Sequence, residues 1–165
     1  MPRDVAKKPA AKSARGSAPP DGDYFLTDFV PYLVNRVASK FNQDFIKDVR
    51  ARKLISISQW RVIAVLHARP GLSLNEIVGH VTIDQPTLSR IVDQLIALGL
   101  VWRAPRPGDG RFVSISLTPQ GLKLFEEIWP LSVLHTRRGT KNLSEREEKT
   151  LVTLLRKVLA NLDEG

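Results

Sequence analysis

Arginine, proline and glycine residues gather in one short segment of the chain, Pro105-Arg106-Pro107-Gly108-Asp109-Gly110-Arg111. A guanidinium is always charged and carries five donors in a planar fork, so a protruding pair of arginines suits an anionic partner. The prolines and glycines predict a turn that carries Arg106 and Arg111 outward. Asp109 can hold Arg111 in a charge-assisted pair, which would aim this side chain before a partner arrives. An ordinary solvated loop tip is the alternative.

Short extended runs flank this turn. Residues 100–103 precede it, and in residues 113–117 apolar residues alternate with serine, at the period of two that is typical of a half-buried strand. We expect Pro105, Pro107, Gly108 and Gly110 to continue neither strand. The segment is therefore predicted to be a β-hairpin with a basic tip.

A second group of polar residues lies at the start of a predicted helix. Asp84 can cap this helix, with Pro86 in the first turn and Gly99 as the stop. The apolar spacing leaves an outer face made of Gln85, Thr87, Ser89, Arg90, Asp93 and Gln94. Arginine pairs bidentately with guanine in a major groove, so Arg90 is the strongest candidate for base contact. The alternative is that Arg90 only caps the helix or pairs with Asp93.

Further helices are needed to position these two groups. Apolar residues at steps of three and four predict a long helix over residues 23–53 and a second helix from Ser56 or Ser58 to His67. Ser73 and Glu76 form a capping box that opens a short helix. This order of elements, a short helix, a turn, a second helix and a hairpin, is that of a winged helix-turn-helix. The predicted fold class of the chain is mainly α with a small β-wing (α+β).

Two more amphipathic helices follow the hairpin. Thr118 is expected to cap a helix that reaches about Arg138, which Pro130 bends, and Ser144 with Glu147 opens the last one. The long first helix and these two have apolar stripes that nothing else in the chain is large enough to cover. We therefore expect two chains to pack through them as a homodimer. The predicted organisation is a disordered basic tail (1–22), an N-terminal dimerisation helix (23–53), a winged helix-turn-helix domain (54–117) and C-terminal dimerisation helices (118–165).

The charge composition of the chain indicates which classes of binding partner it favours. The 165 residues include 25 Lys and Arg against 17 Asp and Glu, for a formal charge of +8. This charge favours nucleic acid, an anionic membrane surface or an acidic partner. Half of the excess lies in residues 1–20, which are either a solvated tail or an arm that follows phosphates. No apolar run is long enough for a membrane span or a signal peptide, so the expected location is cytoplasmic, with no membrane partner.

The residues do not suggest an enzyme. The absence of cysteine excludes disulfides, thiolate metal sites and thiol chemistry. His67, His80 and His135 are scattered, without the spacing of metal ligands or of a catalytic pair. We expect no catalytic residues, no metal and no cofactor.

One stretch of the sequence resembles the signature of a known family of bacterial transcriptional regulators, the MarR family. The resemblance is carried by Asp109-x-Arg111 and then Leu117-Thr118-x-x-Gly121, with support from residues 59–62, 85–95 and 98–101. It extends over about 140 residues, from the first helix to Leu162, and leaves out only the tail. It implies a triangular homodimer on double-stranded DNA, with the recognition helix in the major groove and the wing near the minor groove. The DNA-binding residues would be Gln85, Pro86, Thr87, Ser89, Arg90, Arg106, Asp109 and Arg111, and Lys53 and Arg103 could add backbone contacts.

The same resemblance implies a cleft for a small-molecule effector between the DNA-binding and dimerisation parts. Candidate lining residues are Phe29, Leu33, Arg36, Val37, Trp60, Arg61, Ala64, His67 and Leu124, with Arg36 or Arg61 available to a carboxylate. An aromatic acid or its acyl-coenzyme A thioester would suit such a lining. The alternative is that these residues simply pack in the core.

These expectations combine into one predicted function. The chain would be a ligand-responsive repressor that binds a pseudo-palindromic operator as a homodimer and is released by its effector. The alternative is an architectural or non-specific DNA-binding winged-helix protein without small-molecule control.

Overall fold

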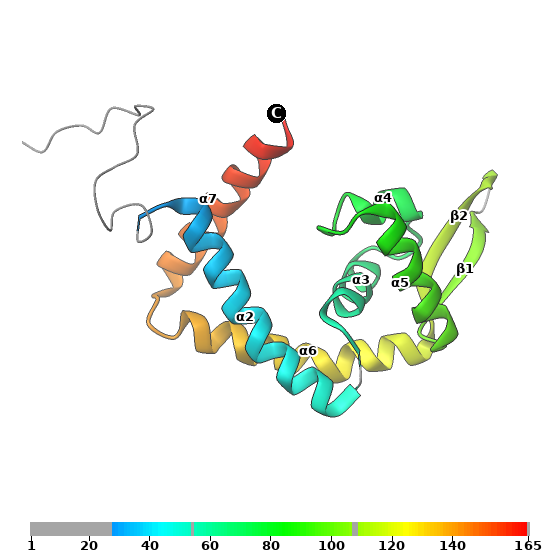
Figure 1. The fold of residues 1–165 in the computed structure, drawn as a ribbon, viewed down its shortest axis with the longest axis horizontal. Helices are drawn as coiled ribbons and strands as arrows, with labels where there is room; N and C mark the ends of the chain where they lie inside the picture. The colour runs from blue at the N-terminus through cyan, green and yellow to red at the C-terminus, as the bar shows by residue number, and fades with distance from the viewer. Residues whose placement is uncertain (1–27, 54, 107–108, 165) are drawn as a thin grey trace, which may run out of the picture. The chain divides into compact units, whose positions relative to one another are not determined.

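The computed structural model describes residues 28–53, 55–106 and 109–164, and it omits the side chains of residues 50, 52, 53, 106 and 109–112. The predicted basic tail and the predicted helix start at residues 23–27 therefore lie outside the described residues. The chain divides into two units, residues 1–37 and 38–165, which are described separately. The elements are mostly helical with one β-hairpin, as predicted (Figure 1).

The long first helix, α2, spans Val30–Lys53. The Leu33 N–H donates to the Phe29 carbonyl, so Pro31 lies in the first turn, where its missing N–H costs nothing. In the unit of residues 1–37, α2 has exposed apolar side chains at Val30, Leu33, Val34 and Val37. In the second unit, Phe45 and Val49 of the same helix are buried in the core.

The predicted N-caps at Ser73 and Asp84 are confirmed, and of the two expected starts of the second helix, Ser56 is its N-cap. Helix α3 (Ile57–Ala68) is capped by Ser56, α4 (Leu74–Val78) by Ser73 and α5 (Gln85–Ala97) by Asp84. Each cap side chain accepts a bond from the backbone N–H three residues later, which satisfies one of the free donors of the first turn. Gly99 follows α5 with a φ of 69°, a left-handed conformation that few residues other than glycine adopt.

The hairpin is longer than its sequence suggests. Strand β1 spans Val101–Arg106 and β2 spans Asp109–Leu117, paired antiparallel from Val101 opposite Leu117 to Pro105 opposite Val113. The expectation that Pro105 and Gly110 could not continue a strand was wrong. In a two-stranded ribbon both strands are edges, so a proline need not break a ladder bond, and the register becomes irregular directly after Pro105.

A third extended segment, which no pattern in the sequence predicted, joins the hairpin. Leu72 pairs with Ile115 of β2 in an antiparallel bridge. Two backbone bonds hold this bridge, Ile115 N–H to the Leu72 carbonyl (2.8 Å) and Gly71 N–H to the Ile115 carbonyl (3.1 Å). The connection between α3 and α4 is thereby fixed to the base of the hairpin.

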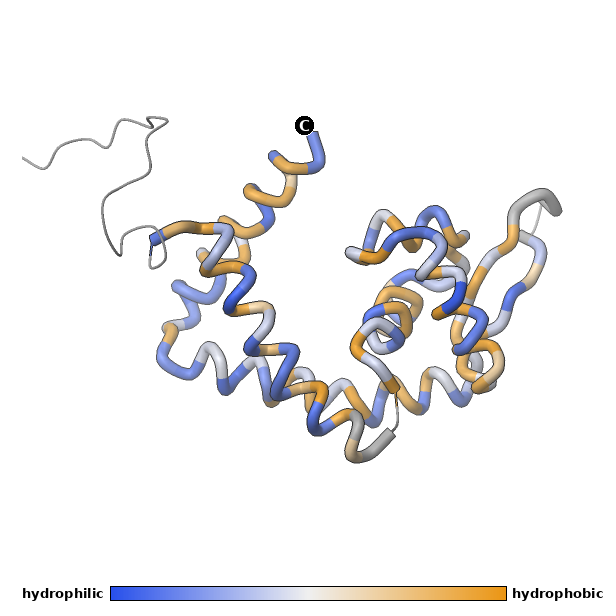
Figure 2. The backbone as a smooth tube through the Cα atoms, viewed as in Figure 1, coloured by the Kyte–Doolittle hydropathy of each residue, from blue (hydrophilic) through white to orange (hydrophobic). Residues whose placement is uncertain are grey.

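Helices α6 (Pro119–Thr140) and α7 (Glu145–Asp163) differ in burial. Among the apolar residues of α6, Leu124, Phe125, Ile128 and Leu131 are buried, whereas Leu122 and Leu134 are 41% and 42% exposed. No residue of α7 is buried. Figure 2 shows apolar residues recurring along α7 between polar ones, and the exposed ones are Leu151, Val152, Leu154, Leu155, Val158, Leu159 and Leu162.

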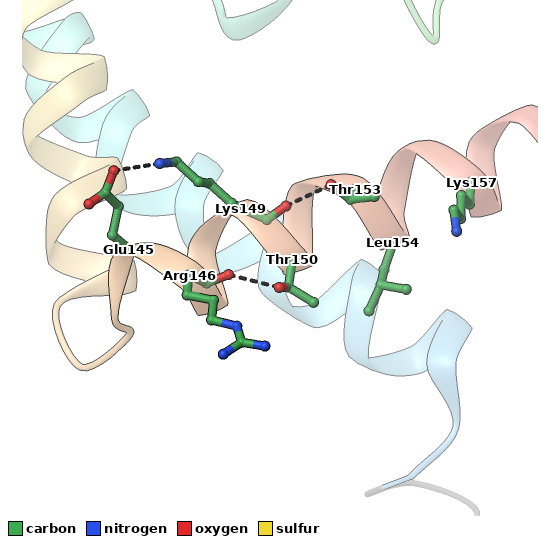
Figure 3. Close-up of a pocket in the computed structure, with 7 residues that line it drawn as sticks. All are labelled: Glu145, Arg146, Lys149, Thr150, Thr153, Leu154 and Lys157. Carbon is green, nitrogen blue, oxygen red and sulfur yellow. Dashed lines mark hydrogen bonds and ion pairs between the residues drawn. The ribbon is translucent and has the colours of Figure 1, made fainter.

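The opposite face of α7 is polar. Figure 3 shows Lys149 paired with Glu145 at 2.6 Å, and the Thr150 and Thr153 hydroxyls bonded to backbone carbonyls of the same helix. At the start of α7, the Ser144 hydroxyl and N–H bond to Glu147 and hold the pKa of its carboxyl below the usual value. An apolar face and a polar face thus run along one helix.

The core lies around α3 and α5. Val62, Ile63 and Leu66 of α3 pack with Leu88 and Leu95 of α5, and all five are essentially inaccessible to solvent. The described helices include none that is long and apolar enough to cross a bilayer.

A tight joint connects the end of α5 to the start of α6. The Thr118 hydroxyl donates to the Gly99 carbonyl at 2.6 Å and accepts from the Gly121 N–H at 3.0 Å, so it caps α6 and ties it to the end of α5. A Cβ at Gly121 would clash with the Leu100 carbonyl oxygen. The pattern Leu117-Thr118-x-x-Gly121 thus has a structural reason: the threonine caps, and the glycine permits close approach.

We predict that Gly121→Ala lowers the free energy of unfolding by about 1–3 kcal/mol, because the backbone of Leu100 must move to admit the methyl group. Gly79→Ala is the matched control, since a Cβ there meets only an ordinary contact at 3.5 Å. Urea unfolding of both variants measures the difference. Equal stability of the two variants would contradict the close approach.

Candidate nucleic-acid interface and effector cleft

The N-terminal half of α5 presents a polar surface on a firmly held backbone. Leu88, Ile91 and Val92 are buried, while Gln85, Pro86, Thr87 and Arg90 are exposed and Ser89 is half-buried. The predicted outer face of this helix is confirmed in its exposure. The side chains that could reach a partner therefore stand on a helix anchored by its other face.

Asp84 stabilises the first turn of this helix. Its carboxylate accepts from the Thr87 N–H at 2.9 Å, and this bond, with a smaller contribution from the Arg90 charge, lowers the pKa of the Asp84 carboxyl. The helix start is thus held by a cap that is ionised at neutral pH. Thr87 and Arg90, three residues apart on the helix, are both exposed, and a hydrogen bond from the Thr87 side chain also contributes to the lowered pKa of Asp84.

Side-chain bonds fix α5 to its neighbours. The Gln85 amide donates to Asn75 of α4 at 2.9 Å, and the Gln59 amide of α3 donates to Gln94 at 3.1 Å. The Gln85 amide, predicted to contact DNA, therefore already has one partner in the free protein. The position of α5 is set before any ligand binds.

Arg103 of β1 pairs with Asp93 of α5 at 3.0 Å. Arg103 is thus not simply a solvated side chain, and Asp93 has a partner other than Arg90. This pair connects β1 of the hairpin to α5. Arg90 has no ion pair with Asp93 that would hold its side chain away from a partner.

The strand ends that flank residues 107–108 are described only in their backbone. The side chains of Arg106, Asp109 and Arg111, and all of residues 107–108, lie outside the described residues. Their backbone belongs to the paired ends of β1 and β2, where Arg106 lies opposite Asp109. The roles assigned to these side chains stay predictions, as does the phosphate contact of Lys53.

A cleft of about 350 Å³ lies among α2, α3 and α6 within the second unit. It is lined by Phe41, Asn42, Phe45, Ile57, Trp60, Arg61, Ser132, His135, Thr136 and Thr140. This volume is near the lower end of the ~300–1,000 Å³ that small-molecule sites occupy. A small organic ligand can fit such a space.

Aromatic side chains form one wall of the cleft and the core behind it. Trp60 packs against Phe45 at 5.7 Å between ring centroids and stacks on Phe125 at 5.4 Å. The His67 ring also stacks on Phe125, with 3.7 Å between the ring centroids. The wall is therefore continuous with the core around α3 and α5.

A polar pair, of which only the histidine is buried, connects α2 and α6 beside the cleft. The His135 Nε2 lies 2.9 Å from an Asp48 carboxylate oxygen, and His135 is only 7% exposed. Close to it, Phe41 of α2 lies over Gly139 of α6, where a Cβ would overlap the ring. These contacts fix the distance between the two helices that border the cleft.

The structure brings together only some of the predicted lining residues. Trp60 and Arg61 border the cleft, whereas Ala64, His67 and Leu124 are not among its lining residues. Phe29, Leu33, Arg36 and Val37 belong to the unit of residues 1–37, where the Arg36 guanidinium donates to the Tyr32 hydroxyl at 3.3 Å. Whether any of these residues contacts a ligand stays a prediction.

Several cleft residues were not among the predicted set. Phe41 and Phe45 share the apolar stripe of the first helix, so periodicity could have indicated them. Asp48 and His135 are 87 residues apart, and no local pattern predicts their contact. The described residues contain no group of three or more His, Asp and Glu side chains that could hold a metal ion.

Comparison with known proteins agrees with this architecture. The model of the MarR family matches residues 55–111, from the start of α3 into β2. A MarR-family transcriptional regulator from Silicibacter pomeroyi is 30% identical, with a TM-score of 0.76 over 84% of this chain and 92% of that one. The match extends well beyond the winged helix, so the surrounding helices are shared as well.

Two further relatives cover most of the chain. The HTH-type transcriptional repressor IacR of Pseudomonas putida is 28% identical over 96% of this chain and 94% of its own length. BpsR of Bordetella bronchiseptica, whose DNA binding is regulated by 6-hydroxynicotinic acid, is 29% identical, with a TM-score of 0.72 over 83% of this chain and 97% of that one. The chain belongs to the MarR family of transcriptional regulators.

Proposed function

We propose that this regulator is a repressor that binds a pseudo-palindromic operator as a homodimer and is released by a small aromatic acid or its acyl-coenzyme A thioester. The observation that carries the DNA-binding part is the exposed polar face of α5, held by the Asp84 cap and by the bond between Gln85 and Asn75. A recognition surface fixed in advance loses little conformational freedom when it binds.

Residues at the start of α5 read the bases in this proposal. A major groove about 12 Å wide admits a helix, and its first turns reach the base edges. Arg90 contacts guanine, while Gln85, Pro86, Thr87 and Ser89 contact neighbouring bases and phosphates. The Arg103–Asp93 pair keeps the wing at a fixed place beside this helix.

The wing supplies sequence-independent affinity. Arg106 and Arg111 enter a narrow minor groove, where the negative potential is strongest, and Asp109 aims Arg111. Since such contacts neutralise phosphate charge and displace counterions, they make binding sensitive to salt.

We predict that Arg106→Ala weakens binding to most DNA sequences alike and flattens the salt dependence by about one phosphate equivalent. Fluorescence anisotropy titrations at four or more salt concentrations, on an operator and on an unrelated duplex, measure both effects. An unchanged affinity together with an unchanged salt slope would show that the wing does not contact DNA.

The exposed apolar face of α7 and that of the first part of α2 support the homodimer. Each face is long, apolar and unburied within one chain. Two-fold symmetry then requires an operator with two inverted half-sites, about one helical turn or ~34 Å apart. Selection from random-sequence duplexes tests this: the proposal expects an inverted repeat, and a non-repeating motif would contradict it.

The cleft supports the effector part of the proposal. It combines aromatic walls with Arg61, a half-buried cation that pairs with no carboxylate among the described residues. Two relatives add to this support: BpsR is regulated by an aromatic acid, and IacR is a repressor. Release of bound operator by aromatic acids or thioesters tests this part, and an architectural DNA-binding protein would not respond to them.

A further inference from the structure

Two side-chain amides meet where α4 and α5 lie next to each other (Figure 1). The Gln85 Nε2 donates to the Asn75 Oδ1 at 2.9 Å. Both side chains are exposed, so this bond lies on the surface that the first turn of α5 presents and not in the core. An exposed bond between two amides adds little to the free energy of unfolding, because water can replace it. The main effect of the bond is thus on the orientation of the Gln85 side chain.

Both amides stand on backbone that is held locally. Asn75 lies in the first turn of α4, where the Ser73 side chain accepts from the Glu76 N–H. Gln85 is the first residue of α5, directly after the Asp84 cap. A side chain that is bonded to a fixed neighbour has lost rotamers before a ligand arrives, so it loses less freedom when it binds. Asn75 therefore prepares the Gln85 amide for a ligand.

The bond also decides which atoms the Gln85 amide can offer. A carboxamide has one carbonyl oxygen and two N–H groups, and Asn75 uses one of these N–H groups. The Gln85 Oε1 and the second N–H have no further bond among the residues that the structure describes. Turning the Gln85 amide round would place its oxygen against the Asn75 oxygen, and two acceptors cannot bond each other. Gln85 therefore presents one acceptor and one donor.

Adenine is the base whose edge complements this pair of groups. In the major groove adenine presents the N6 amino group, a donor, beside N7, an acceptor, and a glutamine amide can bond both. Guanine presents two acceptors there, thymine an acceptor and a methyl group, and cytosine a single donor. Each of these three bases satisfies at most one of the two groups, so the amide orientation selects adenine.

We propose that Gln85 reads an adenine in each half-site, and that Asn75 is the positioning residue that holds the Gln85 amide in the adenine-reading orientation. The Gln85 Oε1 accepts from the adenine N6 amino group, and the second N–H of Gln85 donates to adenine N7. Asn75 acts through Gln85 and bonds no base itself. This inference rests on the base-reading role proposed for α5, to which it adds the base and a residue of α4.

Selection from a pool of duplexes with a random central segment, with the full-length wild type, identifies the half-site. Competition titrations then compare the selected duplex with duplexes in which one base pair is replaced at the same position of both half-sites. We expect an A·T position at which every replacement weakens wild-type binding about tenfold or more. Gln85→Ala should remove this preference and leave the preference at G·C positions unchanged.

Asn75→Ala should lower the adenine preference about two- to tenfold, because the Gln85 side chain regains its rotamers. Asn75→Asp is the matched variant. Its carboxylate still accepts from the Gln85 N–H, so the adenine preference should persist, while the added negative charge weakens binding to all duplexes alike. In a Gln85→Ala background, Asn75→Ala should have no further effect on base preference, because the two residues act as one unit.

Thermal unfolding separates positioning from a structural role. Since the bond between the amides is exposed, Asn75→Ala should melt near the temperature of the wild type. A lower melting temperature, with equal losses of affinity for every duplex, would overturn the proposal. Equal loss of the adenine preference in Asn75→Asp and Asn75→Ala would overturn it too, and so would a Gln85→Ala variant that relaxes the preference only at a G·C position.

The outcomes also distinguish this inference from the base-reading role of α5. If Arg90→Ala relaxes the base preference and Gln85→Ala does not, only the assignment of Gln85 and Asn75 fails. If neither variant changes the preference at any position, base reading by α5 fails and this assignment fails with it.

Discussion

Replacing Arg90 with alanine is expected to reduce the discrimination between an operator and its single-base variants by about 1–3 kcal/mol per half-site. Arg90 is exposed on the anchored helix α5, and Asp93, a carboxylate one turn further along, pairs with Arg103 instead. The guanidinium is therefore available for a bidentate contact with guanine. Since a two-fold dimer uses the residue twice, the loss should be found at both half-sites.

Arg90→Lys is the matched control for this prediction. Lysine keeps the positive charge but lacks the planar fork, so it should lose base discrimination while the salt slope of binding stays near that of the wild type. Titrations against operators substituted at each position measure both quantities. If Arg90→Ala lowers affinity for every sequence alike, Arg90 contacts phosphate and base reading belongs to other residues.

Replacing Leu155 and Leu159 together with glutamate is expected to disrupt the proposed dimer and to weaken operator binding by about 10²–10⁴-fold. Both side chains lie on the exposed apolar face of α7, where Leu159 is 59% exposed within one chain. Charge on this face costs little in a single chain but would be buried between two chains. Loss of the second half-site then removes the gain from bivalent binding.

Thr153→Glu provides the control for the dimer, because Thr153 lies on the polar face of the same helix (Figure 3). This variant should remain a dimer with the operator affinity of the wild type. Sedimentation equilibrium gives the oligomeric state, and circular dichroism checks that each variant stays folded. A dimeric Leu155→Glu, Leu159→Glu variant with full operator affinity would place the interface elsewhere.

Features of the fold that depend on near neighbours could be predicted from the sequence. The caps at Ser56, Ser73 and Asp84 are local, since a side chain bonds a backbone N–H three residues away. The buried and exposed faces of α5 follow from helical periodicity in the same way. The hairpin was expected at the right place but too short, because Pro105 is tolerated on a strand that has one free edge.

Features that depend on distant residues could not be predicted. The bond between His135 and Asp48, and the place of Ser132 in the cleft, depend on how α2, α3 and α6 cross. Gly121 belongs to the sequence motif that resembles the family signature. The reason why a glycine is needed at this position, the close approach of the Leu100 carbonyl, is visible only in the fold. Of the five predicted cleft residues in the second unit, Trp60 and Arg61 lie at its lining and Ala64, His67 and Leu124 do not, because helical periodicity does not distinguish a cleft wall from the core.

Competition between a selected operator and bulk DNA is the most direct test of sequence-specific regulation. The purified protein, bound to a labelled palindromic operator taken from random-sequence selection, is challenged with unlabelled operator or with unlabelled non-specific duplex. We predict that the operator competes at least ~10³-fold more effectively than the non-specific duplex. Competition by both at similar concentrations would contradict a sequence-specific regulator and would indicate an architectural DNA-binding protein.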